Sequence, residues 1–471
     1  MARVSSREDW EQLGFLAEIV DEPVPKNGGS CFSDPSFASN KALPIHRWVP
    51  WIAGFSSSFV KDALSKCLHG RGKVLDPFSG VGTTLVEALL GGHSAIGFEI
   101  NPYAALACRT KVGAHRIDVR ALGEEIGRLR SFWKEKSVAD HTPHSAPPSG
   151  FKTRAEFYSP KVLRKVLIVQ DFIDTVADND LRDLIRLAFA STMVSYSNYS
   201  YEPSLGRRVA AGREEIEDFP VFQTILDKLG EMAADIAWLN ASLPPDRQGA
   251  EVINDSFLRY EQYIPAASVD LIVTSPPYLN NYHYNRNTRP HLYWLGLASQ
   301  PDDLQRLEHV NFGKYWQTVR DKPCVDLEFS LPGCDMAQRL ELLRGLNADK
   351  GIYGGSGWAN YAASYFNDCY KFAQGIKYVL KPGGRALVVI GNSILHGVQI
   401  PTDQYFGQIA ASIGLQMVDI HIPRATRVGN SIIQSEVRVA KAQRAHQLYE
   451  AVVELRRTLP RQILDLPLIF C

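Results

Sequence analysis

The chain has 471 residues, of which 45% are hydrophobic, and its 51 basic and 51 acidic residues give a formal net charge of zero. This length allows a large core and two or three domains, and the charge balance means that any nucleic-acid-binding surface has to be a local basic one. The seven cysteines contain no Cys-x-x-Cys pair, which argues against a zinc framework or a disulfide scaffold and favours a reducing compartment. No basic leader precedes an apolar segment, and no window approaches 18 uninterrupted apolar residues, so we expect a soluble, cytoplasmic protein without a membrane partner.

The beginning of the chain divides into a turn-rich stretch and an aromatic one. Residues 1–40 include Gly28, Gly29 and several prolines, and we expect a poorly ordered arm or a lid. Residues 44–55 combine tryptophan and phenylalanine with proline, ahead of a helix predicted through 59–64. From the residues alone, both tryptophans are expected to pack under that helix.

A glycine-containing turn follows. An apolar strand at 73–75 leads into the sequence DPFSGVGTT (76–84) and then into a helical run, so that Gly80 and Gly82 let the backbone approach a ligand at a helix N-terminus. The third glycine of a dinucleotide fingerprint is missing and no Gly-Lys-Ser/Thr follows, so neither a Rossmann dehydrogenase nor a phosphate loop is favoured. The next strand, at 95–98, ends in Glu99, an acid placed to bond ribose hydroxyls.

The middle of the chain is predicted to be helical. Residues 109–136 are basic, which indicates a solvated helix face or a DNA contact, and 137–150 form a Pro/Ser-rich loop. Apolar residues at spacings of three and four predict a helical insertion over 151–248. Its aromatic and Arg-rich segment, 196–213, either stacks on bases and grips phosphates or caps the helices.

A second motif ends a buried strand. The apolar run 269–273 must stop at TSPPY (274–278), because two prolines cannot continue a sheet ladder. Ligands of open α/β sheets bind at such carboxyl ends, and a small hydroxyl, two rigid prolines and an aromatic ring suit a planar nitrogenous ring; a strand terminator with a packing tyrosine is the alternative. The polar segment 279–289 is a candidate reader of bases or phosphates.

The last third gives fewer signals. Residues 300–355 lack clear periodicity and suggest a second, irregular insertion. Residues 378–392 predict a helix end, a turn and a buried strand, and a terminal hairpin is expected around 423–435, with Val437 and Val439 in its second strand. A helix at about 440–458 is expected to finish the chain.

DPFSGVGTT, the strand-terminal Glu99 and TSPPY together resemble the S-adenosylmethionine-dependent DNA methyltransferases that modify exocyclic amino groups, the N4-cytosine and N6-adenine enzymes. The resemblance covers about residues 44–112 and 250–438. It implies an α/β fold class, a Rossmann-like methyltransferase sheet with helices on both faces, plus a largely helical insertion. The motif order matches the class whose target-recognition region lies between the two motifs, although the Asp-Pro-Phe wording is more typical of a permuted class.

The resemblance also implies a domain organisation. We expect an N-terminal arm at 1–40, a catalytic methyltransferase domain at 41–112 and 250–440, a helical insertion and candidate target-recognition region at 113–249, and a C-terminal helix at 441–471.

Roles for particular residues follow from the same resemblance. S-adenosyl-L-methionine is the implied cofactor, with the candidates His46, Trp48, Asp76, Phe78, Gly80, Gly82, Thr83, Thr84, Glu99, Asn101, Pro102 and Asp255. The implied catalytic residues are Ser275, Pro276, Pro277 and Tyr278. The candidates for DNA binding are Tyr199, Arg207, Arg208, Asn281, Tyr284, Arg286 and Arg289. No metal is expected.

Serine before Pro-Pro-Tyr is commonest among the N4-cytosine enzymes of the resembled family, whereas aspartate or asparagine is commonest among the N6-adenine enzymes. We therefore predict methyl transfer to N4 of a flipped cytosine in double-stranded DNA, within a restriction-modification system that includes a cognate endonuclease. The alternatives are an N6-adenine enzyme, an RNA exocyclic-amine methyltransferase and a catalytically silent DNA-binding protein. Methylation of cytosine carbon is disfavoured, because Cys324 belongs to the only Pro-Cys pair and no Glu-Asn-Val follows it.

Overall fold

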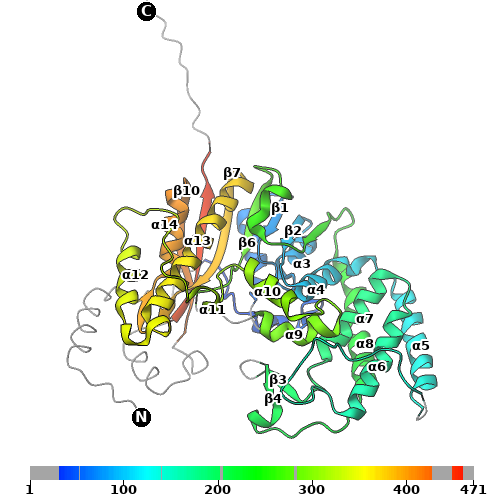
Figure 1. Ribbon diagram of the computed structural model, residues 1–471. Coiled ribbons are helices and arrows are strands. Elements are labelled where there is room, and N and C mark those ends of the chain that lie inside the picture. Colours follow the sequence, from blue (N-terminus) through cyan, green and yellow to red (C-terminus); the bar gives the residue numbers. More distant parts are fainter. Residues whose placement is uncertain are drawn as a thin grey trace, which may run out of the picture.

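The computed structural model describes residues 31–51, 54–138, 141–201, 205–279, 284–426 and 448–459. A central sheet organises the molecule (Figure 1). Its seven strands are β1 (Lys73–Asp76), β2 (Ser94–Phe98), β5 (Ala250–Ile253), β6 (Val269–Thr274), β7 (Leu380–Gly391), β10 (Leu415–Thr426) and β11 (Leu448–Arg457). They lie side by side in the order β10-β11-β7-β6-β1-β2-β5. The pairs from β7 to β5 are parallel, whereas β11 is antiparallel to both of its neighbours.

Helices cover both faces of the sheet, so the predicted α/β fold class is confirmed. In chain order they are α2 (Ser57–Cys67), α3 (Thr83–Leu90), α4 (Pro102–Gly113), α5 (Val119–Lys136), α6 (Pro160–Asp174), α7 (Asn179–Thr192), α8 (Val221–Ser242), α9 (Tyr284–Trp294), α10 (Pro301–Val310), α11 (Trp316–Val319), α12 (Met336–Gly345), α13 (Gly355–Val379) and α14 (Thr402–Ser412). Two small hairpins join β3 (Tyr199–Tyr201) to β4 (Leu205–Arg207) and β8 (Ser393–Leu395) to β9 (Val398–Ile400).

Alternate residues of the central strands feed two separate cores. Val74 and Leu271 belong to the core under α2, α3 and α4, whereas Leu75 and Ile272 belong to the core under α13 and α14. Successive side chains of a strand point to opposite faces, and a parallel sheet is buried on both. Because both faces are buried, the sequences of the central strands are short continuous apolar runs.

The predicted helical insertion is present between α4 and β5. Helices α5 to α8 pack against one another, and their apolar side chains join the first core. Trp133 of α5 stacks on Phe222 of α8 with 4.7 Å between the ring centroids. The β3–β4 hairpin projects below these helices in Figure 1.

The predicted C-terminal helix is wrong where the structure describes it, because Leu448–Arg457 form β11. Val452, Val453 and Leu455 are completely buried between β7 and β10. Insertion into the sheet overrides the helical propensity of the Glu, Ala and Leu residues nearby. The partner of β10 therefore begins at Leu448, and the expected strand residues Val437 and Val439 lie outside the described residues.

Two further expectations need correction. Residues 31–40, expected to belong to a poorly ordered arm or a lid, pack against the protein. Phe32 and Phe37 are buried, and the Asn40 side-chain oxygen accepts a 2.9 Å hydrogen bond from the Ser57 backbone NH at the start of α2. Residues 300–355 contain α10, α11 and α12. The short helices there are separated by turns, which hid their periodicity.

In the part of the chain that the structure describes, no helix is both long and apolar enough to cross a membrane.

Candidate active site

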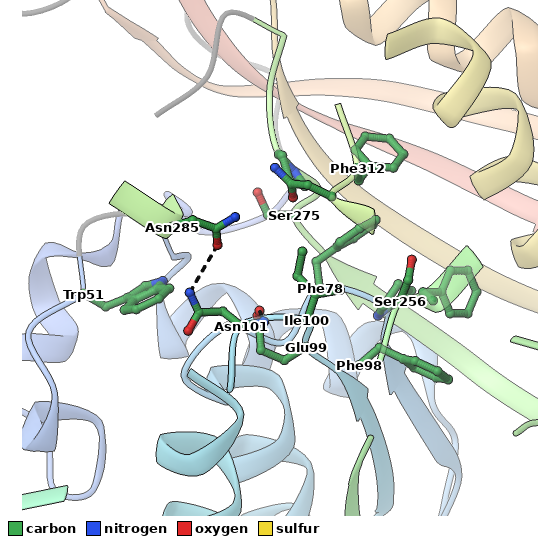
Figure 2. A pocket seen from close by; sticks show the side chains of 15 residues that line it. Trp51, Phe78, Phe98, Glu99, Ile100, Asn101, Ser256, Ser275, Asn285 and Phe312 are labelled. Atoms are coloured by element: carbon green, nitrogen blue, oxygen red, sulfur yellow. Dashed lines mark hydrogen bonds between the residues drawn. The ribbon is translucent and has the colours of Figure 1, made fainter. Parts of the chain in front are cut away.

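A pocket lies at the carboxyl ends of β1, β2 and β6. Its walls come from segments far apart in the chain (Figure 2). They are Trp51, Pro77, Phe78, Gly80, Phe98, Glu99, Ile100, Asn101, Ser256, Phe257, Ser275, Pro277, Asn285, Asn311 and Phe312.

The glycine turn brings bare backbone to this pocket. Gly80 lines it and has φ +49°, a left-handed conformation that favours glycine. Gly82 begins α3 with φ +88°, and a β-carbon there would lie only 2.7 Å from the Cys108 sulfur. Gly80 is therefore needed at the pocket, whereas Gly82 is needed for close packing of the turn against α4.

Asp76 ties the two sequence motifs together below the pocket. Its carboxylate accepts hydrogen bonds from the Thr84 hydroxyl at 2.7 Å, from the Thr274 hydroxyl at 2.6 Å and from the Phe78 backbone NH at 3.1 Å. Burial raises the pKa of this carboxyl to about 6, although all three hydrogen bonds lower it. Asp76 thus fixes the ends of β1 and β6 relative to α3 and lies outside the pocket lining.

Glu99 is the acid that faces the pocket, as Figure 2 shows. Its Oε1 accepts a 2.7 Å hydrogen bond from the Asn101 backbone NH, and the Asn254 side chain donates to the Glu99 backbone carbonyl at 2.7 Å. Burial raises the pKa of the carboxyl to about 7, against the lowering effect of the backbone NH donors. The side chain is thereby fixed as a hydrogen-bonding group at the end of β2.

The second motif contributes Ser275 and Pro277 to the same pocket. The Pro277 carbonyl accepts a 3.0 Å hydrogen bond from the Tyr365 hydroxyl of α13. Pro276 is buried. The Tyr278 hydroxyl lies 3.5 Å from the Ser275 hydroxyl and 3.4 Å from Glu450. A rigid loop therefore presents one serine hydroxyl next to the glycine turn.

Known proteins are similar to this chain in sequence. The model of the N6/N4 DNA methylase family matches residues 41–108, which include the glycine turn and Glu99. The type II methyltransferase M.BsoBI of Geobacillus stearothermophilus is 23% identical over 84% of this chain and 83% of its own length. M.AvaI of Nostoc sp. is 22% identical over 84% of each chain, and M.MvaI of Kocuria varians is 22% identical over 70% of this chain and 72% of its own.

These matches support an S-adenosylmethionine-dependent DNA amino-methyltransferase of the N4/N6 family. The pocket fits the cofactor of this family. Gly80 leaves room for a ligand beside the turn, Glu99 offers hydrogen-bond acceptors, and Phe98 and Phe257 supply aromatic walls. Four of the cofactor candidates predicted from the sequence line the pocket: Phe78, Gly80, Glu99 and Asn101.

The other cofactor candidates of this methyltransferase lie elsewhere. Asp255 bonds to Tyr263 at 2.6 Å and to Arg259 at 3.1 Å, and the next residues, Ser256 and Phe257, line the pocket in its place. The candidates that supply no pocket wall are His46, Trp48, Asp76, Gly82, Thr83, Thr84, Pro102 and Asp255. Asp255 therefore lies next to the pocket wall rather than in it, and its contact with the cofactor stays a prediction.

His46 and Trp48 are held in a buried network instead. His46 Nε2 lies 2.8 Å from Glu87, and burial lowers the pKa of its imidazole. Trp48 Nε1 donates to Asp235 of α8 at 2.9 Å. Trp51, three residues on, is the aromatic residue of this segment that reaches the pocket.

The predicted DNA contacts lie mainly on the β3–β4 hairpin and α9. Tyr199 is buried, with its ring 5.4 Å from that of Phe157, so packing explains it. Arg207 is exposed and bonds to the side chain of Glu215, whereas Arg208 is partly exposed and bonds to the carbonyl of Glu214. The remaining candidates are on or before α9.

On α9, Arg286 is exposed, whereas Arg289 donates to the Lys152 carbonyl at 2.6 Å and lies over the Phe151 ring. Tyr284 is the first residue of the helix, and Asn281 lies outside the described residues. Among the described residues, no group of three His, Cys, Asp or Glu side chains could hold a metal ion.

The sequence interpretation missed several residues that line the pocket, including Ser256, Asn285, Asn311 and Phe312. Trp51 belongs to the aromatic segment 44–55, so the sequence did contain a signal for its role in the pocket. Asn311 and Phe312 follow α10 in a stretch without periodicity, and no local signal points to them.

Proposed function

We propose that this protein transfers a methyl group from S-adenosylmethionine to the exocyclic N4 of a cytosine flipped out of duplex DNA. The observation that carries the proposal is the presence of Ser275, Gly80 and Glu99 in the walls of one pocket. The preference for cytosine rests on serine before Pro-Pro-Tyr. An N6-adenine specificity is the second candidate, because adenine requires the same type of acceptor in a wider pocket.

The cofactor, when bound, supplies an electrophilic methyl group on a sulfonium. An exocyclic amine conjugated to its ring is a poor nucleophile, so the protein has to accept its protons and orient its lone pair. We assign this task to the hydroxyl of Ser275, which lies in the pocket wall, and the Pro276 carbonyl is its proposed partner. Tyr278, whose ring packs beside Gly391, holds the loop and offers an aromatic face near the base. The target base must leave the duplex because its amine is unreachable inside.

The relatives are named type II methyltransferases, which supports a role in type II modification. Double-stranded DNA as the substrate and a cognate restriction endonuclease as a functional partner are further parts of the proposal. The test is nucleoside mass spectrometry and product mapping on DNA from cells that express the protein. N4-methylcytosine is the expected product. Detection of N6-methyladenine without N4-methylcytosine would show that the target base is adenine and not cytosine. Methyl transfer to transfer RNA but not to duplex DNA would favour the RNA alternative.

Glu99 leads to a prediction about pH. Since burial raises the pKa of this carboxyl to about 7, the ionised acceptor is lost as the pH falls below 7. If the carboxylate receives ribose hydroxyls, the Kd for S-adenosylmethionine should be constant above pH 7 and rise by up to about tenfold per pH unit below it. Titration calorimetry at several pH values measures this dependence. Glu99→Gln should bind more weakly at pH 8 and lose the pH dependence; a Glu99→Gln curve parallel to that of the wild type would exclude Glu99 as its source.

DNA recognition is proposed for residues 113–249 together with α9. Replacing Arg207, Arg208 and Arg286 by alanine should weaken DNA binding and reduce the slope of log K against log salt by about 0.9 for each phosphate that the variant no longer neutralises. The matched control replaces Arg71, Arg247 and Lys381, exposed cations at the amino ends of the strands, away from the pocket. Equal slopes in both triple variants would place the DNA-binding surface elsewhere.

A further inference from the structure

Helix α9 lies between the pocket and the β3–β4 hairpin, and it carries an unusual run of buried polar side chains. Asn285, Asn287 and Thr288 are each only 5% exposed. A buried amide or hydroxyl is destabilising unless it is hydrogen-bonded, so these side chains require specific partners. The partners lie on two different parts of the protein.

The first set of partners belongs to the cofactor pocket. Asn101, which follows β2 and lines the pocket, donates from Nδ2 to the Thr288 hydroxyl at 2.7 Å and to Asn285 Oδ1 at 3.4 Å. Asn285 also lines the pocket, and Figure 2 places it opposite Glu99, between Trp51 and Ser275. The other face of Asn101 caps α4, because its Oδ1 accepts from the backbone NH groups of Tyr103 and Ala104. The start of α9 is thus bonded to a fixed wall of the pocket.

The second set of partners belongs to the hairpin. Asn287 Oδ1 accepts a 3.0 Å hydrogen bond from the Leu205 backbone NH of β4, and the Asn287 carbonyl accepts one of 3.0 Å from the Tyr201 hydroxyl of β3. Residues two apart on a helix point about 200° apart, whereas residues three apart share a face. Asn285 and Thr288 therefore face Asn101 in the pocket wall, while Asn287 faces the hairpin.

The rest of α9 is anchored to the protein body. His291 stacks on Tyr103 with 4.2 Å between the ring centroids, and Arg186 of α7 donates to the Leu295 carbonyl just beyond the helix at 2.7 Å. Burial lowers the pKa of His291 to about 4, so its ring is neutral when it packs there. The carboxyl end of α9 is thus held, and the asparagines lie near its other end.

We propose that Asn285 and Asn287 are positioning residues through which occupancy of the cofactor pocket sets the placement of the β3–β4 hairpin on DNA. A ligand in the pocket contacts the wall formed by Asn285 and Asn101 and favours the docked position of α9. The docked helix holds the hairpin through Asn287. Cofactor and DNA then bind with positive coupling, which by linkage is the same in either order. This inference rests on the proposed function, since it takes the hairpin to be a DNA contact.

The experiment measures the Kd for a duplex oligonucleotide, taken from the sites that the wild-type enzyme methylates, with and without saturating S-adenosylhomocysteine. For the wild type, the cofactor product should tighten DNA binding by about tenfold, within the usual range of coupling. Asn285→Ala and Asn287→Ala should each reduce this factor to near one. A merely structural defect would weaken DNA binding equally in both conditions and leave the factor intact.

Asn240→Ala, an exposed asparagine on α8, is the matched control and should keep the wild-type factor. Thr288→Val tests the pocket side again without loss of volume, and it should behave as Asn285→Ala does. The inference is overturned if Asn285→Ala and Asn287→Ala keep the wild-type ratio of DNA affinities with and without S-adenosylhomocysteine. It is also overturned if this ratio is one for the wild type. Failure of the wild type to bind S-adenosylhomocysteine or DNA at all would instead overturn the proposed function.

Discussion

Replacement of Gly80 by leucine is expected to weaken S-adenosylmethionine binding by about 100-fold, or about 2.7 kcal/mol. Gly80 lines the pocket in the left-handed region, and a β-carbon on it would lie 3.4 Å from Trp51 Nε1. An L side chain in that region costs roughly 1–2 kcal/mol, and the leucine would also occupy ligand space. Titration calorimetry on the purified variant gives the affinity directly.

The control separates backbone strain from occlusion of the pocket. Gly333 has φ +82° with open space around its β-carbon position, so Gly333→Leu introduces similar strain far from the pocket lining. Its cofactor affinity should equal that of the wild type, and thermal melting shows whether each variant is folded. A folded Gly80→Leu protein that binds the cofactor normally would move the site away from the glycine turn.

The sheet and its turns could be predicted because their signals are local. β1, β2 and β6 are short apolar runs that each end at a polar or proline-containing turn, and the ligand site of a parallel sheet lies at such ends. Strand β11 could not be predicted in this way. Its sequence, with Glu450, Ala451 and Glu454, is compatible with a helix, and only its place between β7 and β10 makes it a strand.

The candidate site could be predicted only in part. Residues within the motifs, such as Gly80, Glu99 and Ser275, line the pocket, because a motif fixes the backbone that carries them. Asp255 shows the limit of this reasoning. Its carboxylate bonds with the side chains of Arg259 and Tyr263, which no spacing rule includes, and this orientation brings Ser256 rather than Asp255 into the pocket wall.

Residues that reach the pocket from distant segments needed the three-dimensional structure. Phe312 approaches Phe78 at 5.1 Å between ring centroids, although the two residues are far apart in the sequence. Asn285 arrives through a helix that begins after the second motif. These contacts depend on how α9 and α10 pack, which is a property of the whole core.

Replacement of Ser275 by alanine is expected to lower kcat by about 100-fold while leaving cofactor affinity nearly unchanged, in the range expected when an acid–base group is removed. The hydroxyl faces the pocket from a loop fixed by Tyr365, so its removal deletes an acceptor without releasing the loop. The acceptor is needed only as the amine changes geometry, and an interaction made only in the transition state affects kcat and kcat/KM together.

The matched control for Ser275 is a serine in another wall of the same pocket. Ser256→Ala removes a hydroxyl beside Phe257, and it should raise KM for the cofactor while kcat stays within about twofold of the wild type. Steady-state kinetics with the mapped DNA substrate, combined with single-turnover rates, distinguishes a slower chemical step from slower product release. If Ser275→Ala retained the single-turnover rate, the protons of the target amine would have to be accepted by the loop backbone, and the serine would no longer support the choice of cytosine over adenine. The predicted outcome, a slow chemical step in Ser275→Ala with normal cofactor binding, would make this hydroxyl part of the catalytic site.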